Sequence, residues 1–148
     1  MNAFEAANAS DSIDFRDAVP NVLVKAGGYF FGATGFFVAG SGLQLLIFAD
    51  WQWMWLATAA TLMTLGTVGI LVAAFVIKGR SWAAVFGVPL SALTAVVTVA
   101  WAAYMLLSLA ISPLTLLAAL LACVSAMLVP FTVPGSLKAT RARNALYA

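Results

Sequence analysis

One stretch of the sequence decides the fold: residues 26–48, which read AGGYFFGATGFFVAGSGLQLLIF. The stretch has no charged side chain, and it exceeds the about 20 residues that a helix needs to cross a bilayer core of about 30 Å. In water each of its glycines would weaken a helix by about 1 kcal/mol relative to alanine. In lipid the backbone has no other hydrogen-bond partner, so the helix persists. The stretch therefore predicts a membrane-spanning helix.

Three more uncharged apolar runs follow, and together the four runs fill most of the 148 residues. The chain is 64% hydrophobic and 8% charged, whereas a soluble domain is about 25% charged. We predict an all-α integral membrane four-helix bundle over residues 22–135. Because the connections are short, we expect up-down-up-down packing of sequential helices. The predicted spans cover residues 22–49, 53–77, 82–109 and 113–133.

The two ends of the chain differ from the spans in composition. Residues 1–21 form a polar leader, which we interpret as a short interfacial helix, a disordered segment or a segment that docks on a partner protein. Ser112 and Pro113 are typical of a helix start. Pro130 and Pro134, with Gly135, predict the end of the last helix. Residues 136–148 then form a short basic tail.

The basic residues predict the orientation in the membrane, because Lys and Arg gather in cytoplasmic segments. They fall before the first span, between the second and third, and after the fourth: Arg16, Lys25, Lys78, Arg80, Lys138, Arg141 and Arg143. We therefore expect both termini in the cytoplasm and a multi-pass protein of the plasma (inner) membrane. The tail could also contact acidic lipid headgroups, although topology explains its three charges more simply. Split over short segments, the charges make no continuous basic face, so we expect no nucleic-acid partner.

The chain lacks the residues that most membrane chemistry requires. It has no histidine and a single cysteine, Cys123, which we interpret as a packing residue. Every acidic or basic side chain lies outside the spans or, like Lys25, at the edge of one, whereas coupled transporters, small multidrug exporters among them, need a membrane-embedded charge. We therefore expect a non-enzymatic protein without a metal or a cofactor.

Small residues line one face of the first span. Gly28 and Gly32 form a GxxxG motif, and steps of three and four residues extend it. The face comprises Gly28, Gly32, Gly35, Ala39 and Gly42. Such a groove lets another helix backbone approach closely. We expect a close helix contact here, either within the chain or with another subunit.

Tryptophans mark the span boundaries, where an indole ring can be buried while its N–H stays in contact with water. We expect the interfacial anchors to be Trp51, Trp53, Trp55 and Trp82.

Some polar side chains remain inside the spans: Gln44, Ser91, Thr94 and Thr98. They could line a hydrated path. The simpler interpretation is that each hydroxyl bonds a carbonyl of its own helix, and that Gln44 makes one interhelical hydrogen bond.

We expect a small accessory or scaffold subunit that packs in the bilayer against other integral membrane proteins or copies of itself, with membrane lipids as its other partners. One alternative is an oligomeric pore or facilitator for a neutral solute or ion. A weaker alternative is a lipid-organising protein that uses the tryptophan-rich hairpin and the basic ends.

Overall fold

The computed structural model describes residues 18–48, 52–108 and 112–147, and all four of its helices are long and apolar enough to cross a membrane. The helices are α2 (Val22–Phe48), α3 (Trp53–Ile77), α4 (Ser81–Leu107) and α5 (Pro113–Tyr147). The prediction of an all-helical protein with four packed apolar helices is confirmed. The leader, except residues 18–21, and the predicted boundaries at residues 49 and 109 lie outside the described residues.

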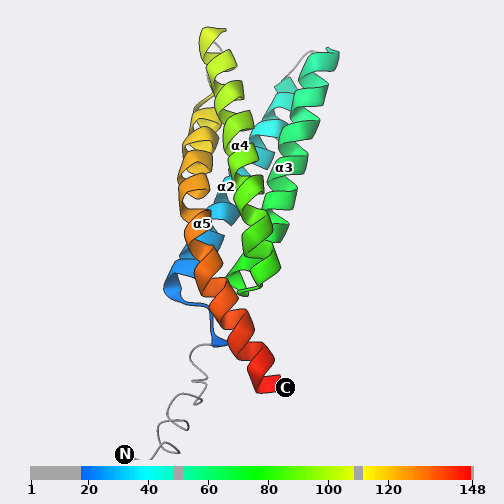
Figure 1. The fold of residues 1–148 in the computed structure, drawn as a ribbon. Coiled ribbons are helices and arrows are strands. Elements are labelled where there is room, and N and C mark those ends of the chain that lie inside the picture. Colours follow the sequence, from blue (N-terminus) through cyan, green and yellow to red (C-terminus); the bar gives the residue numbers. More distant parts are fainter. Residues whose placement is uncertain (1–17, 49–51, 109–111, 148) are drawn as a thin grey trace, which may run out of the picture.

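The helices form a closed ring in chain order (Figure 1). α2 packs along α3 and α5, and α4 packs along α3 and α5, whereas the two diagonal pairs scarcely touch. Each helix starts at the end of the bundle where the preceding one stops (Figure 1). The start of α2 and the end of α5 therefore lie at the same end.

Side-chain size, rather than polarity, separates the inside of the bundle from the outside. The buried positions of α2 include Val24, Gly27, Phe31, Thr34, Val38 and Ser41, and those of α5 include Ala122, Ser125, Val129, Thr132, Ser136 and Ala139. Both sets alternate steps of three and four residues, the period at which two helices keep one seam in contact. Many bulky side chains face outward instead, among them Tyr29, Phe36, Leu107 and Met127.

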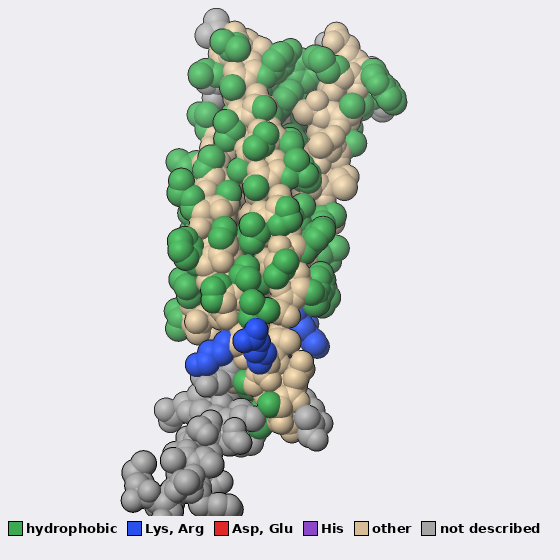
Figure 2. Space-filling model, viewed as in Figure 1, with side chains coloured by type: hydrophobic (Ala, Val, Ile, Leu, Met, Phe, Trp, Pro, Cys, Tyr) green, Lys and Arg blue, Asp and Glu red, His purple; other side chains and the backbone are tan. Residues whose placement is uncertain are grey.

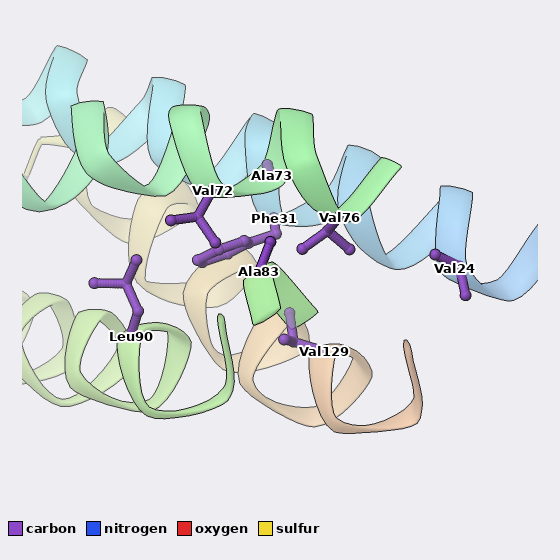
Figure 3. Packing of buried hydrophobic residues seen from close by; sticks show 8 residues of the cluster. All are labelled: Val24, Phe31, Val72, Ala73, Val76, Ala83, Leu90 and Val129. Atoms are coloured by element: carbon purple, nitrogen blue, oxygen red, sulfur yellow. The ribbon is translucent and has the colours of Figure 1, made fainter. Parts of the chain in front are cut away.

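Phe31 is the largest fully buried side chain, and its ring lies beside two glycines at a distance that an added methyl group would fill with ordinary van der Waals contact. A methyl group added at Gly69 of α3 would lie 3.9 Å from Phe31 Cε2, and one at Gly87 of α4 would lie 3.8 Å from Phe31 Cε1. Figure 3 shows the ring reaching in from α2 among the side chains of the surrounding helices. The surrounding cluster contains Val24, Val72, Ala73, Val76, Ala83, Leu90 and Val129.

The prediction that Pro130, Pro134 and Gly135 end the last helix is wrong, because α5 continues to Tyr147. Its 35 residues span about 52 Å at about 1.5 Å per residue. This exceeds the about 30 Å of a bilayer core, and the last turns extend beyond the bundle (Figure 1). Each proline removes one hydrogen-bond donor, but the turns around them are held against α2: a methyl group at Gly135 would lie 2.7 Å from Val24 Cγ2. Packing therefore overrides the helix-breaking tendency.

Candidate functional site

The glycine face of α2 lies directly against α3 of the same chain. A methyl group added at Gly35 would lie 2.6 Å from Gly66 O and 2.9 Å from Ile70 N. One at Gly42 would lie 2.8 Å from Ala59 O. These neighbours are backbone atoms, so the two helices touch main chain to main chain.

The remaining members of this face lie along the same contact. A methyl group at Gly28 would lie 3.1 Å from Ile77 N, and one at Gly32 would lie 3.5 Å from Ala73 Cβ. Ala39 closes the contact from the α2 side, since a methyl group at Gly66 would lie 2.5 Å from Ala39 N. Of the two predicted uses of the groove, the structure shows the one within the chain.

A second face of α2, which the sequence analysis did not single out, meets α5 through hydroxyl groups. Thr34 Oγ1 lies 2.9 Å from Phe30 O, 3.1 Å from Leu121 O and 2.5 Å from Ser125 Oγ. Ser125 Oγ also lies 3.3 Å from Phe30 O. Both hydroxyls are buried, and together they bridge the two helices. A lone Thr and a lone Ser that are 91 residues apart give no signal in the sequence.

Three of the predicted polar-path residues lie inside the bundle on α4. Ser91 donates to Val88 O (2.9 Å), Thr94 to Leu90 O (2.8 Å) and Thr98 to Thr94 O (2.7 Å). All three are buried. Each hydroxyl thus has a partner on its own helix.

The fourth predicted polar-path residue, Gln44, takes part in a contact of its own. Ser112 Oγ, just before α5, donates to Gln44 Oε1 at 2.9 Å. The structure therefore places Gln44 in a link between α2 and α5, and not in a hydrogen bond with the α4 hydroxyls.

The predicted aromatic anchors divide into two kinds. Trp53 and Trp82 are 83% and 54% exposed, as an anchor requires, whereas Trp51 lies outside the described residues. Trp55 instead packs edge-on against Trp101 of α4, with ring centroids 5.5 Å apart. Its Nε1 donates to Gln52 Oε1 (3.2 Å). The Trp55 ring therefore packs α3 against α4, and its indole N–H has a hydrogen-bond partner.

The cations of the described residues gather at the end of the bundle where the chain enters and leaves it. Figure 2 shows Lys and Arg side chains in a band at the edge of the apolar body. The described residues contain no Asp or Glu, and their cations are Lys25, Lys78, Arg80, Lys138, Arg141 and Arg143. We call the exposed ones, which exclude the half-buried Arg143, the basic rim: Lys25, Lys78, Arg80, Lys138 and Arg141.

Below the apolar body, the turn between α3 and α4 is held by a glycine in the left-handed region. Gly79 has φ 67°, its N–H donates to Val76 O (2.7 Å), and the Arg80 N–H donates to Phe75 O (3.0 Å). This is the Schellman pattern that ends a helix and satisfies its last carbonyls.

Arg143 lies on the extension of α5. It donates hydrogen bonds to backbone carbonyls of the α3–α4 turn that the Schellman pattern leaves without a partner. Arg143 Nη2 donates to Lys78 O (2.9 Å) and Gly79 O (3.1 Å), and its Nε donates to Ala18 O (3.2 Å). Thr140 Oγ1 adds a bond to Gly79 O (3.3 Å). The sequence analysis placed Arg143 in a basic tail and did not foresee this role, because a lone tail arginine shows nothing about its partner. We call this group of bonds the Arg143 clamp.

The described residues hold no cluster of His, Cys, Asp or Glu able to bind a metal ion. In the same part of the chain, every buried side-chain nitrogen or oxygen has a hydrogen-bond partner.

Comparison with known proteins adds no relative: no family model, no curated protein and no solved structure matches this chain. The fold and its geometry define a multi-pass membrane protein, and its function has to be inferred from its surfaces.

Proposed function

We propose that this chain is a non-catalytic accessory or scaffold subunit that packs in the plasma (inner) membrane against other integral membrane proteins or copies of itself. One observation carries the proposal: each buried polar side-chain atom of the described residues already has a partner within the chain. The spans also lack Asp, Glu, Lys and Arg between residues 26 and 137, since Asp50, Lys78 and Arg80 lie in the connections. An interior without free polar groups leaves the outer surface as the place for function.

The glycine groove of α2 is filled by α3, so a partner has to use another surface. The outward face of α3 carries small exposed side chains at Ala57, Ala60, Thr61, Thr64 and Thr67. Small residues let two membrane helices approach closely. The outward face of α2, in contrast, carries Tyr29 and Phe36. The α3 face is therefore the surface to probe.

The test is the mass of the protein–detergent particle purified gently from its native membrane, with its co-purified proteins identified. We expect a particle larger than one chain, and Ala60→Phe with Thr64→Phe should release the partner. Ala33→Phe is the matched control, because Ala33 is exposed on α2. A monomer without any co-purified protein would contradict the proposal.

A pore formed by several copies is the alternative function, and the geometry favours it less. Ser91, Thr94 and Thr98 are buried within one bundle, and their hydroxyl protons are already donated. Copies placed side by side would not bring these groups to a shared lumen. Solute flux into liposomes that contain only this protein would favour the pore over the scaffold subunit.

For the orientation we propose up-down-up-down insertion with both termini in the cytoplasm. The gathering of the described cations at one end supports it (Figure 2). In a Cys123→Ser background, Lys78→Cys should react with a membrane-impermeant thiol reagent only after the cytoplasmic side is opened. Gln52→Cys, at the other end, should react in intact cells.

A further inference from the structure

The basic rim combines two features that together indicate a ligand at the membrane surface. Its members come from separate parts of the chain: Lys25 from α2, Lys78 and Arg80 from the ends of the α3–α4 turn, and Lys138 and Arg141 from α5. All of them are exposed.

The height of the rim on the molecule identifies where its ligand lies. In Figure 2 the Lys and Arg side chains begin where the continuous cover of apolar side chains ends. For a bundle that crosses a membrane, this level is the layer of lipid headgroups. A Lys or Arg at this level attracts an anionic headgroup with about 1 kcal/mol.

The Arg143 clamp holds parts of the rim together. Its bonds to Lys78 O, Gly79 O and Ala18 O tie the extension of α5 to the α3–α4 turn and to the chain before α2. Without the Arg143 bonds, only Thr140 would join the extension of α5 to the α3–α4 turn. The cations are therefore presented by fixed backbone rather than by a loose tail.

From these observations we propose that the basic rim binds the phosphate-bearing headgroups of anionic lipids in the leaflet at this end of the bundle, in preference to zwitterionic lipids. Lys25, Arg80 and Arg141 pair with the headgroup phosphates, and Arg143 is a positioning residue. The inference rests on the proposed membrane orientation only for the identity of the leaflet. It is independent of whether the chain binds other proteins.

The test is lipid competition on the full-length, delipidated protein in detergent, read by native mass spectrometry with equimolar phosphatidylglycerol and phosphatidylcholine. We expect the wild type to retain phosphatidylglycerol. Because a cation contributes about 1 kcal/mol, or about fivefold in affinity, Arg80→Gln with Arg141→Gln should lower the preference by about 25-fold. The matched control, Arg80→Lys with Arg141→Lys, keeps the charge and should keep most of the preference. Salt at about 1 M, where the screening length is about 3 Å, should weaken binding by the wild type.

Three results would overturn the proposal. One is equal retention of both lipids by the wild type, which would show that the rim serves orientation alone. The second is a preference that appears only after Asp11→Asn, Asp14→Asn and Asp17→Asn, which would show that the acidic leader occupies the rim. The third is displacement of phosphatidylglycerol by an equal concentration of inorganic phosphate, which would identify a site for free phosphate. We expect no such displacement, because the lipid is also held by its chains.

Arg143→Gln separates the positioning role from a direct charge contact. It should reduce the lipid preference and also speed amide hydrogen exchange in the last turns of α5. Arg141→Gln should reduce the preference and leave that exchange unchanged. Equal exchange in the two variants would contradict the positioning role.

Discussion

α2 packs along α3 on one side and along α5 on the other, and these two seams differ in their chemistry. Toward α3, glycines bring main chain against main chain, so that a methyl group at Gly35 would lie 2.6 Å from Gly66 O. Toward α5, the contact is made by side chains, with Thr34 and Ser125 in hydrogen bond and Thr132 lying over Gly27. A backbone neighbour cannot move aside, whereas a side chain can rotate or be replaced. The α3 seam should therefore be intolerant of change and the α5 seam adaptable.

The largest effect should come from Gly35→Ala. The new methyl group would meet Gly66 O at 2.6 Å and Ile70 N at 2.9 Å, and neither backbone atom can yield. We expect a loss of about 3 kcal/mol in the free energy of unfolding, measured by unfolding in mixed micelles. Gly32→Ala is the matched control on the same helix, because its methyl group would meet Ala73 Cβ at an ordinary 3.5 Å. Equal losses in both variants would contradict the close backbone contact.

A smaller effect should come from Gly27→Ala on the α5 seam, and a second substitution should reverse it. The new methyl group would collide with Thr132 Cγ2, the end of a side chain. We expect a loss of about 1 kcal/mol in the same assay. Thr132→Ser removes that methyl group and keeps the hydroxyl that donates to Val129 O. The double variant should recover most of the loss, and failure to recover would show that the α5 seam is as rigid as the α3 seam.

The hydrogen-bonded hydroxyls of Thr34 and Ser125 should contribute still less to the free energy of unfolding. Thr34→Val and Ser125→Ala, alone and together, form a double-mutant cycle on the bridge between α2 and α5. Interhelical hydrogen bonds in membranes average about 0.6 kcal/mol, and we expect a coupling energy of that size. Thr61→Val is the control, because the Thr61 hydroxyl is exposed and donates only to Ala57 O. A coupling energy near zero would reduce the bridge to two independent packing residues.

Gly79→Ala lies outside both seams and should have the smallest effect on the packing of the four helices, although it strains the α3–α4 turn itself. Alanine at φ 67° costs about 1 kcal/mol, and its methyl group would lie 2.7 Å from Arg143 Nη2. We expect local opening of the Arg143 clamp, measured as faster hydrogen exchange at residues 140–146, and little change in α2. Faster exchange along α2 would show that the clamp supports the seams as well.

The sequence predicted the elements that depend on length, charge and spacing. The apolar runs gave the helices, and the glycine spacing on α2 marked the face that meets α3. The spacing did not reveal the partner of that face, because a groove looks the same whether its occupant is Gly66 of the same chain or another protein. The Thr34–Ser125 bridge was missed because two small hydroxyls in apolar runs resemble ordinary packing residues.

The end of α5 was mispredicted for a physical reason. Pro130 and Pro134 break helices in water, where a freed carbonyl has a solvent partner and a bend has little cost. Here the turns around them lie against α2, where a methyl group at Gly135 would lie 2.7 Å from Val24 Cγ2. Packing against the neighbouring helix compensates for the prolines.

The Arg143 clamp also has a consequence for the order of assembly. Arg143 is translated after each of the residues whose carbonyls it binds: Ala18, Lys78 and Gly79. Until the last turns of α5 emerge from the ribosome, those carbonyls depend on water at the membrane surface. A segment synthesised after the first three spans thus ties the chain before α2 to the α3–α4 turn, and a ribosome stalled before residue 143 would hold a bundle without these bonds.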